Sequence, residues 1–479
     1  MSTLRSIGAL IGGEIVVGGG RATRPVINPA TGDVLGQLTL VTKEDLADAA
    51  ERAAAGFAEW SAKTAIFRSG VLRAVASAMR RDATQMAQML TQEQGKTIKE
   101  AAGEVAGAAE LFDWLAEEGK RLYGRVVPSR VPEIQQTVLL EPIGPVAAFS
   151  PWNYPLALAA RKVAHALAAG CSVVIKPAEE APSAVLHLAG LCIAEGVPAN
   201  AIQVVFGEPA MVSETLIEAP QIRKISFTGS VPVGRHLAQL AGRALKKVTF
   251  ELGGHSPVIV MDDADLERAV AQSVASKFRN AGQICIAPTR FFVHDAIFDA
   301  FVSRFTAQAE ALRVENGMLD TSQMGPLAHE RRLDAMEDLA RDAVKVGAKV
   351  ATGMVERKND KGFFWKPTVL TDVPLNARIL HEEPFGPIAP FVRFTSLEQA
   401  IKLANDVQFG LAGYAFTRSL KHARDIRDGI KVGALGMNTY NVTAPEMPFL
   451  GIKDSGLGVA QGKEGLLDHM NIKSYFQAD

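Results

Sequence analysis

Residues 145–177 read PVAAFSPWNYPLALAARKVAHALAAGCSVVIKP, and this stretch decides the fold class. An apolar strand segment, PVAAFS, comes first, and a second one, SVVIKP, ends the stretch. The residues between them have a helical pattern that stops at Gly170, and glycine commonly follows the last turn of a helix. Continuous apolar strands on both sides of a helix predict a parallel sheet covered by helices.

The same alternation continues to residue 250. The expected helices are 182–196 and 231–242, and the expected strands are 201–207, 224–230 and 247–252. Sheets of this kind bind ligands at the carboxyl ends of their strands. The residues that directly follow each strand are therefore candidate site residues.

A second series of helices and strands follows Glu251 and predicts a second α/β lobe. A helix at 262–280 begins with acidic residues and ends with basic ones, as the helix dipole favours. The other expected elements of this lobe are 289–295, 298–312, 388–394, 397–406, 410–416, 420–429 and 432–438.

Two further segments differ from both series. Residues 42–119 are rich in Ala, Glu, Arg and Lys at helical spacing, which predicts several amphipathic helices. Residues 123–144 alternate around prolines, which predicts an extended hairpin that projects as an arm.

Composition narrows the function classes. The chain has 479 residues, 48% of them hydrophobic, and exceeds the size of one ordinary core. A net charge of -1 gives no basic field for nucleic acid or a membrane surface. The longest uncharged run, 142–160, contains several prolines and does not suit a membrane span. Three cysteines cannot all pair, and Cys171 and Cys192 lie in apolar runs, so we expect a reducing, cytoplasmic environment.

Three polar residues suggest covalent catalysis. Cys285 lies in NAGQICIAP, on a Gly-Gln turn where a thiol would gain little stabilisation from packing. Glu251 ends a strand before two glycines and has room to act as a general base. Asn153 lies at another strand end and could donate to a developing oxyanion. Taken singly, a core thiol, a surface glutamate and a helix cap remain open alternatives; together the three fit thiol attack on a carbonyl followed by hydride transfer.

Two strand ends suggest a nucleotide site. Gly229 in FTGSVPVG lets backbone N–H groups approach a phosphate at a helix N-terminus, although a plain tight turn is an equal alternative. Lys176 and Glu179 follow an apolar strand, where they would meet a ribose, with a solvated loop as the alternative. No HExxH or CxxC motif occurs, so we expect no metal site.

Several motifs occur in the order found in NAD(P)-dependent aldehyde dehydrogenases, and the chain resembles that family over nearly its whole length. The motifs are PWNYP (151–155), KPAEE (176–180), FTGS (227–230), ELGG (251–254), GQICIAPTR (282–290), EEPFGP (382–387) and SGLG (455–458). The stretches KFRNAGQIC and ARKVAHALAAGCSVVIKPAEE look most like the succinate-semialdehyde dehydrogenase branch.

The resemblance implies a three-part α/β fold and a homodimer or homotetramer. A Rossmann-like parallel-sheet domain for the cofactor would span 1–122 and 142–250, and a second α/β catalytic domain would span 251–445. A β-hairpin oligomerisation arm with a C-terminal tail would comprise 123–141 and 446–479.

The resemblance also implies a role for each site residue. Cys285, as a thiolate, is the expected nucleophile, and its backbone N–H with Asn153 forms the oxyanion hole. Loss of hydride from the thiohemiacetal leaves a thioester, and Glu251 activates the water that hydrolyses it. The expected cofactor contacts are Lys176 and Glu179 at the adenosine ribose, Gly229 and Ser230 near the pyrophosphate, Trp152, Glu383 at the nicotinamide ribose and Phe385 at the nicotinamide.

Substrate and cofactor follow from a few charged residues. By resemblance, Arg161 and Arg279 grip a substrate carboxylate, which favours a short semialdehyde such as succinate semialdehyde. A 2-oxoglutarate semialdehyde, a sulfonated aldehyde and aliphatic or aromatic aldehydes stay open. Glu179 would repel a 2′-phosphate, so NAD is expected over NADP, although Lys176 leaves NADP possible. Ala460 stands where the family often has a glutamate, so a proton route through that position is not carried over.

Two rival classes remain. A cysteine hydrolase or acyltransferase could use Cys285 and Glu251, but the nucleotide-like half, 144–250, argues against it. An inactive binding protein is the other rival, and the presence of Cys285, Glu251 and Asn153 argues against that class.

Overall fold

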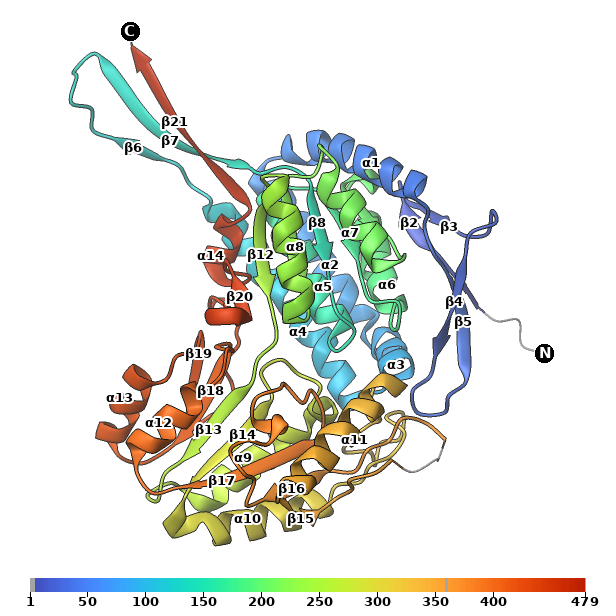
Figure 1. Ribbon diagram of the computed structural model, residues 1–479. Helices are drawn as coiled ribbons and strands as arrows, with labels where there is room; N and C mark the ends of the chain where they lie inside the picture. The colour runs from blue at the N-terminus through green and yellow to red at the C-terminus, as the bar shows by residue number, and fades with distance from the viewer. Residues whose placement is uncertain (1–4, 358–360, 479) are drawn as a thin grey trace.

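The computed structural model of the chain describes residues 5–357 and 361–478, and two large sheets organise it (Figure 1). The strands of the larger sheet lie in the order β20 (Gly456–Leu457), β12 (Lys247–Glu251), β11 (Lys224–Thr228), β8 (Val146–Phe149), β9 (Val173–Lys176), β10 (Ile202–Val204), β2 (Ala9–Ile11) and β3 (Glu14–Val16). From β12 to β10 neighbouring strands are parallel, whereas β20, β2 and β3 pair antiparallel at the edges. Residues 145–177, the stretch quoted first, supply β8 and β9, and both strands are fully buried between helices.

Helices cover both faces of this sheet. The helix between β8 and β9 is α5 (Pro155–Ala169), which begins with a proline and ends at Gly170, whose φ of 89° is left-handed. The other connecting helices are α6 (Ser183–Ala194), α7 (Pro209–Glu218) and α8 (Val231–Arg243). The expected N-terminal helices are α1 (Lys43–Ser61), α2 (Ala65–Arg81), α3 (Ala83–Gln94) and α4 (Ile98–Glu118). Capping boxes at Thr42 and Thr97 fix the starts of α1 and α4.

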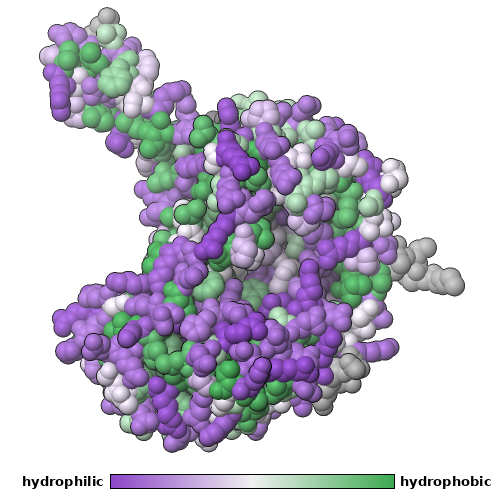
Figure 2. Space-filling model, in the orientation of Figure 1, coloured by the Kyte–Doolittle hydropathy of each residue, from purple (hydrophilic) through white to green (hydrophobic). Residues whose placement is uncertain are grey.

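The second sheet lies in the other half of the molecule (Figure 1). Its strand order is β15 (Lys349–Thr352), β16 (Thr368–Thr371), β17 (Ile388–Phe394), β14 (Pro288–His294), β13 (Ser256–Val260), β18 (Ala412–Phe416) and β19 (Ala434–Met437). Only the β15–β16 pair is antiparallel within this sheet, as the structure describes it. Its helices are α9 (Leu266–Phe278), α10 (Asp295–Glu310), α11 (Glu330–Lys345), α12 (Leu397–Asn405) and α13 (Leu420–Gly429). The surface is hollowed between the two halves (Figure 2).

A three-stranded arm projects from the body, with the C-terminus at its tip (Figure 1). It consists of β6 (Arg125–Val127), β7 (Ile134–Pro142) and β21 (Met470–Ala478), and β21 runs antiparallel to β7 along nine residue pairs. The remaining elements are β1 (Arg5–Ile7), β4 (Thr23–Ile27), β5 (Val34–Thr39), α14 (Gly462–Leu467) and the short 3₁₀ turns Gly119–Arg121, Ala199–Ala201, Arg378–Leu380 and Lys453–Ser455.

The expected α/β class, the two lobes, the N-terminal helices and the projecting hairpin are confirmed. One assignment differs: the sequence predicts arm and tail over residues 446–479, but β20 lies in this segment and pairs with β12 of the larger sheet. The exact domain boundaries stay a prediction. No helix in the described residues is long and apolar enough to cross a membrane.

Candidate functional site

Cys285 lies on a tight turn between α9 and β14. A 3₁₀ turn, η3 (Arg279–Gly282), follows α9, and Asn280, Ala281 and Gly282 have φ values of 48°, 53° and 72°. A Cβ on Gly282 would come within 2.3 Å of the Gly386 carbonyl oxygen, so this position requires glycine. This left-handed turn redirects the chain after α9 and presents the thiol just before β14.

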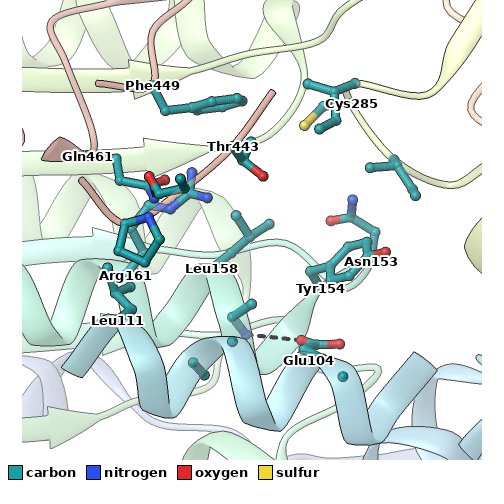
Figure 3. Close-up of a pocket in the computed structure, with 18 of the residues that line it drawn as sticks. Glu104, Leu111, Asn153, Tyr154, Leu158, Arg161, Cys285, Thr443, Phe449 and Gln461 are labelled. Atoms are coloured by element: carbon teal, nitrogen blue, oxygen red, sulfur yellow. Dashed lines mark hydrogen bonds between the residues drawn. The ribbon is translucent and has the colours of Figure 1, made fainter. Parts of the chain in front are cut away.

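Two cavities, each of about 470 Å³, share Cys285 as a wall residue. Asn153 and Leu158 also line both cavities. The first cavity contains Arg161, Glu251 and the side chains drawn in Figure 3, and we call it the substrate cavity. The second, which we call the cofactor cavity, contains Gly229 and Ser230 at the start of α8. The sulfur therefore lies where the two cavities meet.

The surroundings of Cys285 favour the neutral thiol. Burial, together with the negative charges of Glu251 and Glu383, raises the pKa of the Cys285 thiol to about 12. The positive charge of Arg161 acts in the opposite direction but does not offset burial. The sequence led us to expect an ionised sulfur, whereas at neutral pH this site holds a thiol that must lose its proton before attack. Cys171 and Cys192 are fully buried, as expected.

Asn153 lies on the same side of the substrate cavity as Cys285 (Figure 3). Its Nδ2 donates to the Gln283 carbonyl oxygen at 3.0 Å, which leaves its second proton for another acceptor. Within 5–357 and 361–478, no other residue accepts a hydrogen bond from the Cys285 backbone N–H. Both donors belong to residues that line the junction of the two cavities, which is where an oxyanion hole for a substrate on Cys285 would have to lie.

A buried polar cluster holds the backbone of Asn153 in place, and the sequence did not predict it. Lys96 Nζ donates to the Asn153 carbonyl oxygen at 2.9 Å and pairs with Glu104 at 2.5 Å, and neither side chain of the pair is exposed. Glu104 in turn accepts from the backbone N–H groups of Leu156 and Ala157, each at 2.9 Å, at the start of α5. In the sequence this lysine lies in QGKTIKE, residues 94–100, where Gly-Lys-Thr resembles part of a phosphate-binding loop but Leu90 replaces the first glycine that such a loop needs. Lys96 lies two residues before α4 and Glu104 lies within it, so their pairing depends on how the chain enters this helix and has no local sequence signal.

Glu251 ends β12 and faces the substrate cavity, but both of its oxygens are occupied. Oε1 accepts from Arg161 Nη1 at 2.6 Å, and Oε2 accepts from Thr228 Oγ1 at 2.7 Å. Burial on its own would raise the pKa of Glu251, but the positive charges of Arg161 and Lys162 outweigh it and hold this pKa below its usual value. In this arrangement the carboxylate is a weak base.

The two arginines expected to grip a substrate anion differ in their surroundings. Arg161, on α5, is paired with Glu251, and its guanidinium lies 5.0 Å from the centre of the Phe449 ring. Arg279 follows α9, is exposed, and makes no ion pair with any residue that the structure describes. Both line the substrate cavity, so both could meet the same ligand.

The cofactor cavity brings together five of the seven residues expected there. They are Trp152, Gly229, Ser230, Glu383 and Phe385. The ring centroids of Trp152 and Phe385 are 5.4 Å apart, so the two rings form an aromatic wall. Ser230 precedes the first turn of α8, and its side chain makes no capping hydrogen bond. Burial raises the pKa of Glu383 to about 7, against a hydrogen bond from the Gly254 N–H that lowers it.

Lys176 and Glu179 bind one another at the carboxyl end of β9. Lys176 Nζ lies 2.5 Å from Glu179 Oε1, and both side chains are buried. They are not among the residues that line the two cavities above. Because β9 and β11 are parallel strands on either side of β8, this pair and Ser230 lie at the same edge of the sheet.

The cofactor cavity suits a dinucleotide. N-terminal N–H groups of a helix such as α8 suit a phosphate, a carboxylate such as Glu383 suits ribose hydroxyls, and the aromatic wall suits a planar ring. Both ring nitrogens of His329, which also lines this cavity, are buried without a hydrogen-bond partner in the described chain. Such polar atoms favour a polar ligand. No cluster of three or more potential metal ligands occurs in the described residues.

A cysteine that lines both a substrate-sized cavity and a dinucleotide-suited cavity, on parallel α/β sheets, is the arrangement that a dehydrogenase with a cysteine nucleophile requires. The chain belongs to the aldehyde dehydrogenase family, whose model matches residues 16–475. It is accordingly an oxidoreductase that acts on aldehydes, and the resemblance seen in the sequence motifs is confirmed.

Three similar proteins illustrate the range of this family. A 4-(hydroxymethyl)benzenesulfonate dehydrogenase of Comamonas testosteroni is 48% identical over 97% of this chain and 96% of its own length. The NADP(+) succinate-semialdehyde dehydrogenase of Escherichia coli is 40% identical over the same shares of the two chains. The crystal structure of succinate-semialdehyde dehydrogenase from Burkholderia pseudomallei has 41% identity and a TM-score of 0.96, covering 99% of this chain and 98% of the other.

Proposed function

We propose that this protein oxidises a small anionic aldehyde to the corresponding acid with NAD(P) as hydride acceptor. The observation that carries the proposal is the position of Cys285, which belongs to both cavities and can touch a substrate in one and a cofactor in the other. A hydrolase needs no second cavity of this kind, and the rival hydrolase class is therefore the weaker explanation.

The proposed acylation begins at Cys285. The thiol loses its proton to solvent, and its sulfur adds to the aldehyde carbon, so that a C–S bond forms and the carbonyl electrons move to oxygen. Asn153 Nδ2 and the Cys285 backbone N–H stabilise this oxyanion, each by about 3 kcal/mol. When bound, the oxidised nicotinamide supplies a positive charge beside the sulfur and accepts the hydride that leaves the former aldehyde carbon.

Hydrolysis of the resulting thioester is the second proposed stage. Water adds to the thioester carbon while Glu251 takes its proton, the C–S bond breaks, and the sulfur leaves with the bond electrons. The product is the carboxylic acid, and Cys285 is ready for another substrate. Glu251 can act in this way only after it has left Arg161, because its oxygens are occupied in the structure.

An anionic substrate is supported by the cavity and by two relatives. Arg161 and Arg279 place two guanidinium groups on its wall, and guanidinium groups bind carboxylates and sulfonates through paired N–H donors. One relative is named for succinate semialdehyde and another for an aromatic sulfonate. Succinate semialdehyde is our first candidate, and a sulfonated or aromatic aldehyde with a negative group is the alternative.

For the cofactor we propose NAD over NADP. Glu179 would accept from both ribose hydroxyls and would repel a 2′-phosphate. Lys176, paired with Glu179 at 2.5 Å, is the group that would have to turn to a 2′-phosphate for NADP to bind. The Escherichia coli relative is named for NADP(+), so both cofactors belong in the test.

The experiment follows NADH absorbance with NAD or NADP and a panel of aldehydes that includes succinate semialdehyde. The wild-type protein is expected to reduce NAD, and Cys285→Ala is expected to abolish the reaction. Cys192→Ala, which alters a buried thiol of α6, is the matched control and should retain activity. Equal turnover by Cys285→Ala and wild type would reject the mechanism, and ester hydrolysis without NADH formation would favour the hydrolase class.

A further inference from the structure

Glu251 is restrained by a residue of the substrate cavity itself. Its contact with Arg161 Nη1, at 2.6 Å, holds one carboxylate oxygen, and Thr228 Oγ1 holds the other at 2.7 Å. The Glu251 side chain is only 4% exposed and that of Arg161 15% exposed. An ion pair this well shielded from water is screened less than a surface pair, so separating Glu251 from Arg161 is costly unless another anion takes its place.

Arg161 lies where such an anion would arrive. In Figure 3 it lies with Gln461 on the opposite side of the cavity from Cys285, and Leu158 lies between them. The face of α4 toward this cavity carries Gly103 and Gly107, and a Cβ at either position would meet no atom within 4 Å. An extended aldehyde whose carbonyl is at Cys285 therefore has room to reach Arg161 with its far end.

We propose that Arg161 is a positioning residue that restrains the general base until the anionic end of the substrate displaces Glu251 from its guanidinium. The inference rests on the proposed function and extends it. Glu251 holds Nη1 of the Arg161 guanidinium, and a substrate anion that binds both Nη atoms as a fork needs the same Nη1, so the two anions compete for it. Once released, Glu251 loses the neighbour that weakens it as a base and can reach the thioester at Cys285.

This role differs from simple anchoring in what it does to the rate. An anchor that binds the substrate anion equally in the ground state and the transition state lowers KM and leaves kcat unchanged. Release of Glu251 acts on thioester hydrolysis, so a neutral aldehyde should be acylated onto Cys285 and then hydrolysed slowly. Arg279, which has no ion pair within the described chain, is expected to act as an anchor only.

The first test needs no variant. Butanal and succinate semialdehyde have the same chain length, and only the latter carries an anion. With wild-type enzyme and NAD, butanal should give a rapid burst of about one NADH per site followed by a slow phase, and succinate semialdehyde a faster steady phase. Added acetate should speed the slow phase of butanal about tenfold, a change of about 1.4 kcal/mol. Chloride at equal ionic strength is the control.

The second test removes the restraint. Arg161→Met should oxidise butanal about tenfold faster than wild type in the steady phase and should no longer respond to acetate. Arg279→Met should raise KM for succinate semialdehyde. Arg235→Met, which breaks an exposed pair with Asp454 on the surface of α8, is the control for loss of an arginine.

The outcomes separate this inference from the proposed function. The inference is overturned if acetate speeds the wild-type reaction no more than chloride does, or if Arg161→Met does not oxidise butanal faster than wild type. Arg161 would then only anchor the substrate, and the proposed aldehyde oxidation would stand. No NADH from any aldehyde would overturn both. If Arg161→Met does not fold, the acetate measurement on wild type decides alone.

Discussion

Glu383 is a carboxyl group whose protonation contributes to the stability of the folded chain. Its pKa is about 7, raised from 4.5 by burial, so the folded chain holds this proton more tightly than the unfolded chain does. A proton held more tightly by the folded state stabilises it, and this contribution is lost as pH rises through about 7. Glu383→Gln keeps the shape of the side chain and removes the titration.

We expect Glu383→Gln to gain stability relative to wild type as pH rises from about 5 to about 8, by about 2 kcal/mol. Urea unfolding of both proteins without cofactor, at several pH values, measures this difference. Glu398→Gln on the exposed start of α12 is the control and should track wild type. A difference between Glu383→Gln and wild type that is constant with pH would contradict the raised pKa.

At the same scale, the sequence suggested three residues that line one cavity, but it did not show which side chain pairs with Glu251. Asn153 and Glu251 could be grouped from the sequence pattern, because each lies at the carboxyl end of a parallel strand of one sheet, whereas Cys285 precedes a strand of the other sheet and was joined to them by the motif resemblance. The partner of Glu251 could not be predicted, because Arg161 is 90 positions away and their contact depends on how α5 packs beside β12. Lys96 was missed for the same reason, since only the folded chain brings it under Asn153.

Among the elements, the left-handed turn before Cys285 requires a glycine at position 282. We expect Gly282→Ala to destabilise the protein by about 3 kcal/mol or more, because the new Cβ would meet backbone atoms of Gly386 and the residue must keep a positive φ. Gly190→Ala is the matched control: it lies in α6 with no atom within 4 Å of a new Cβ, so alanine should stabilise the helix by about 0.5–1 kcal/mol. Thermal unfolding compares the three proteins. Equal melting temperatures for the two variants would contradict the steric argument.

Many elements could be predicted from periodicity, whereas α11, β15 and β16 were not predicted and the missed strands β13 and β20 have separate causes. The expected helix at 182–196 corresponds to α6, and the expected strand at 388–394 to β17. The central strand β13 was missed because SPVIV is short and directly follows a glycine-rich turn. The edge strand β20 has two residues and no pattern of its own, so its place is set by pairing with β12.

At the scale of the whole molecule, the arm exposes several large apolar side chains to solvent. Val126, Ile472 and Phe476 are 69%, 73% and 63% exposed, and every residue of β21 after Met470 is exposed. Apolar side chains also show on the arm in Figure 2. A three-stranded sheet with apolar residues open to water is a poor independent structure, and an exposed apolar patch of this kind usually marks an interface. We propose that the arm packs against a second copy of the chain, as a homodimer or homotetramer requires.

The double substitution Ile472→Asp with Phe476→Asp tests this proposal. Burial of each side chain at an interface contributes about 2 kcal/mol, and a charge there adds a desolvation cost, so the variant should dissociate at concentrations where wild type remains assembled. Sedimentation equilibrium over a range of concentrations measures the masses. Leu420→Asp, at a residue 90% exposed at the start of α13, controls for loss of an exposed apolar side chain away from the arm. The proposal is wrong if the wild-type protein sediments as a monomer, or if the double variant assembles as wild type does.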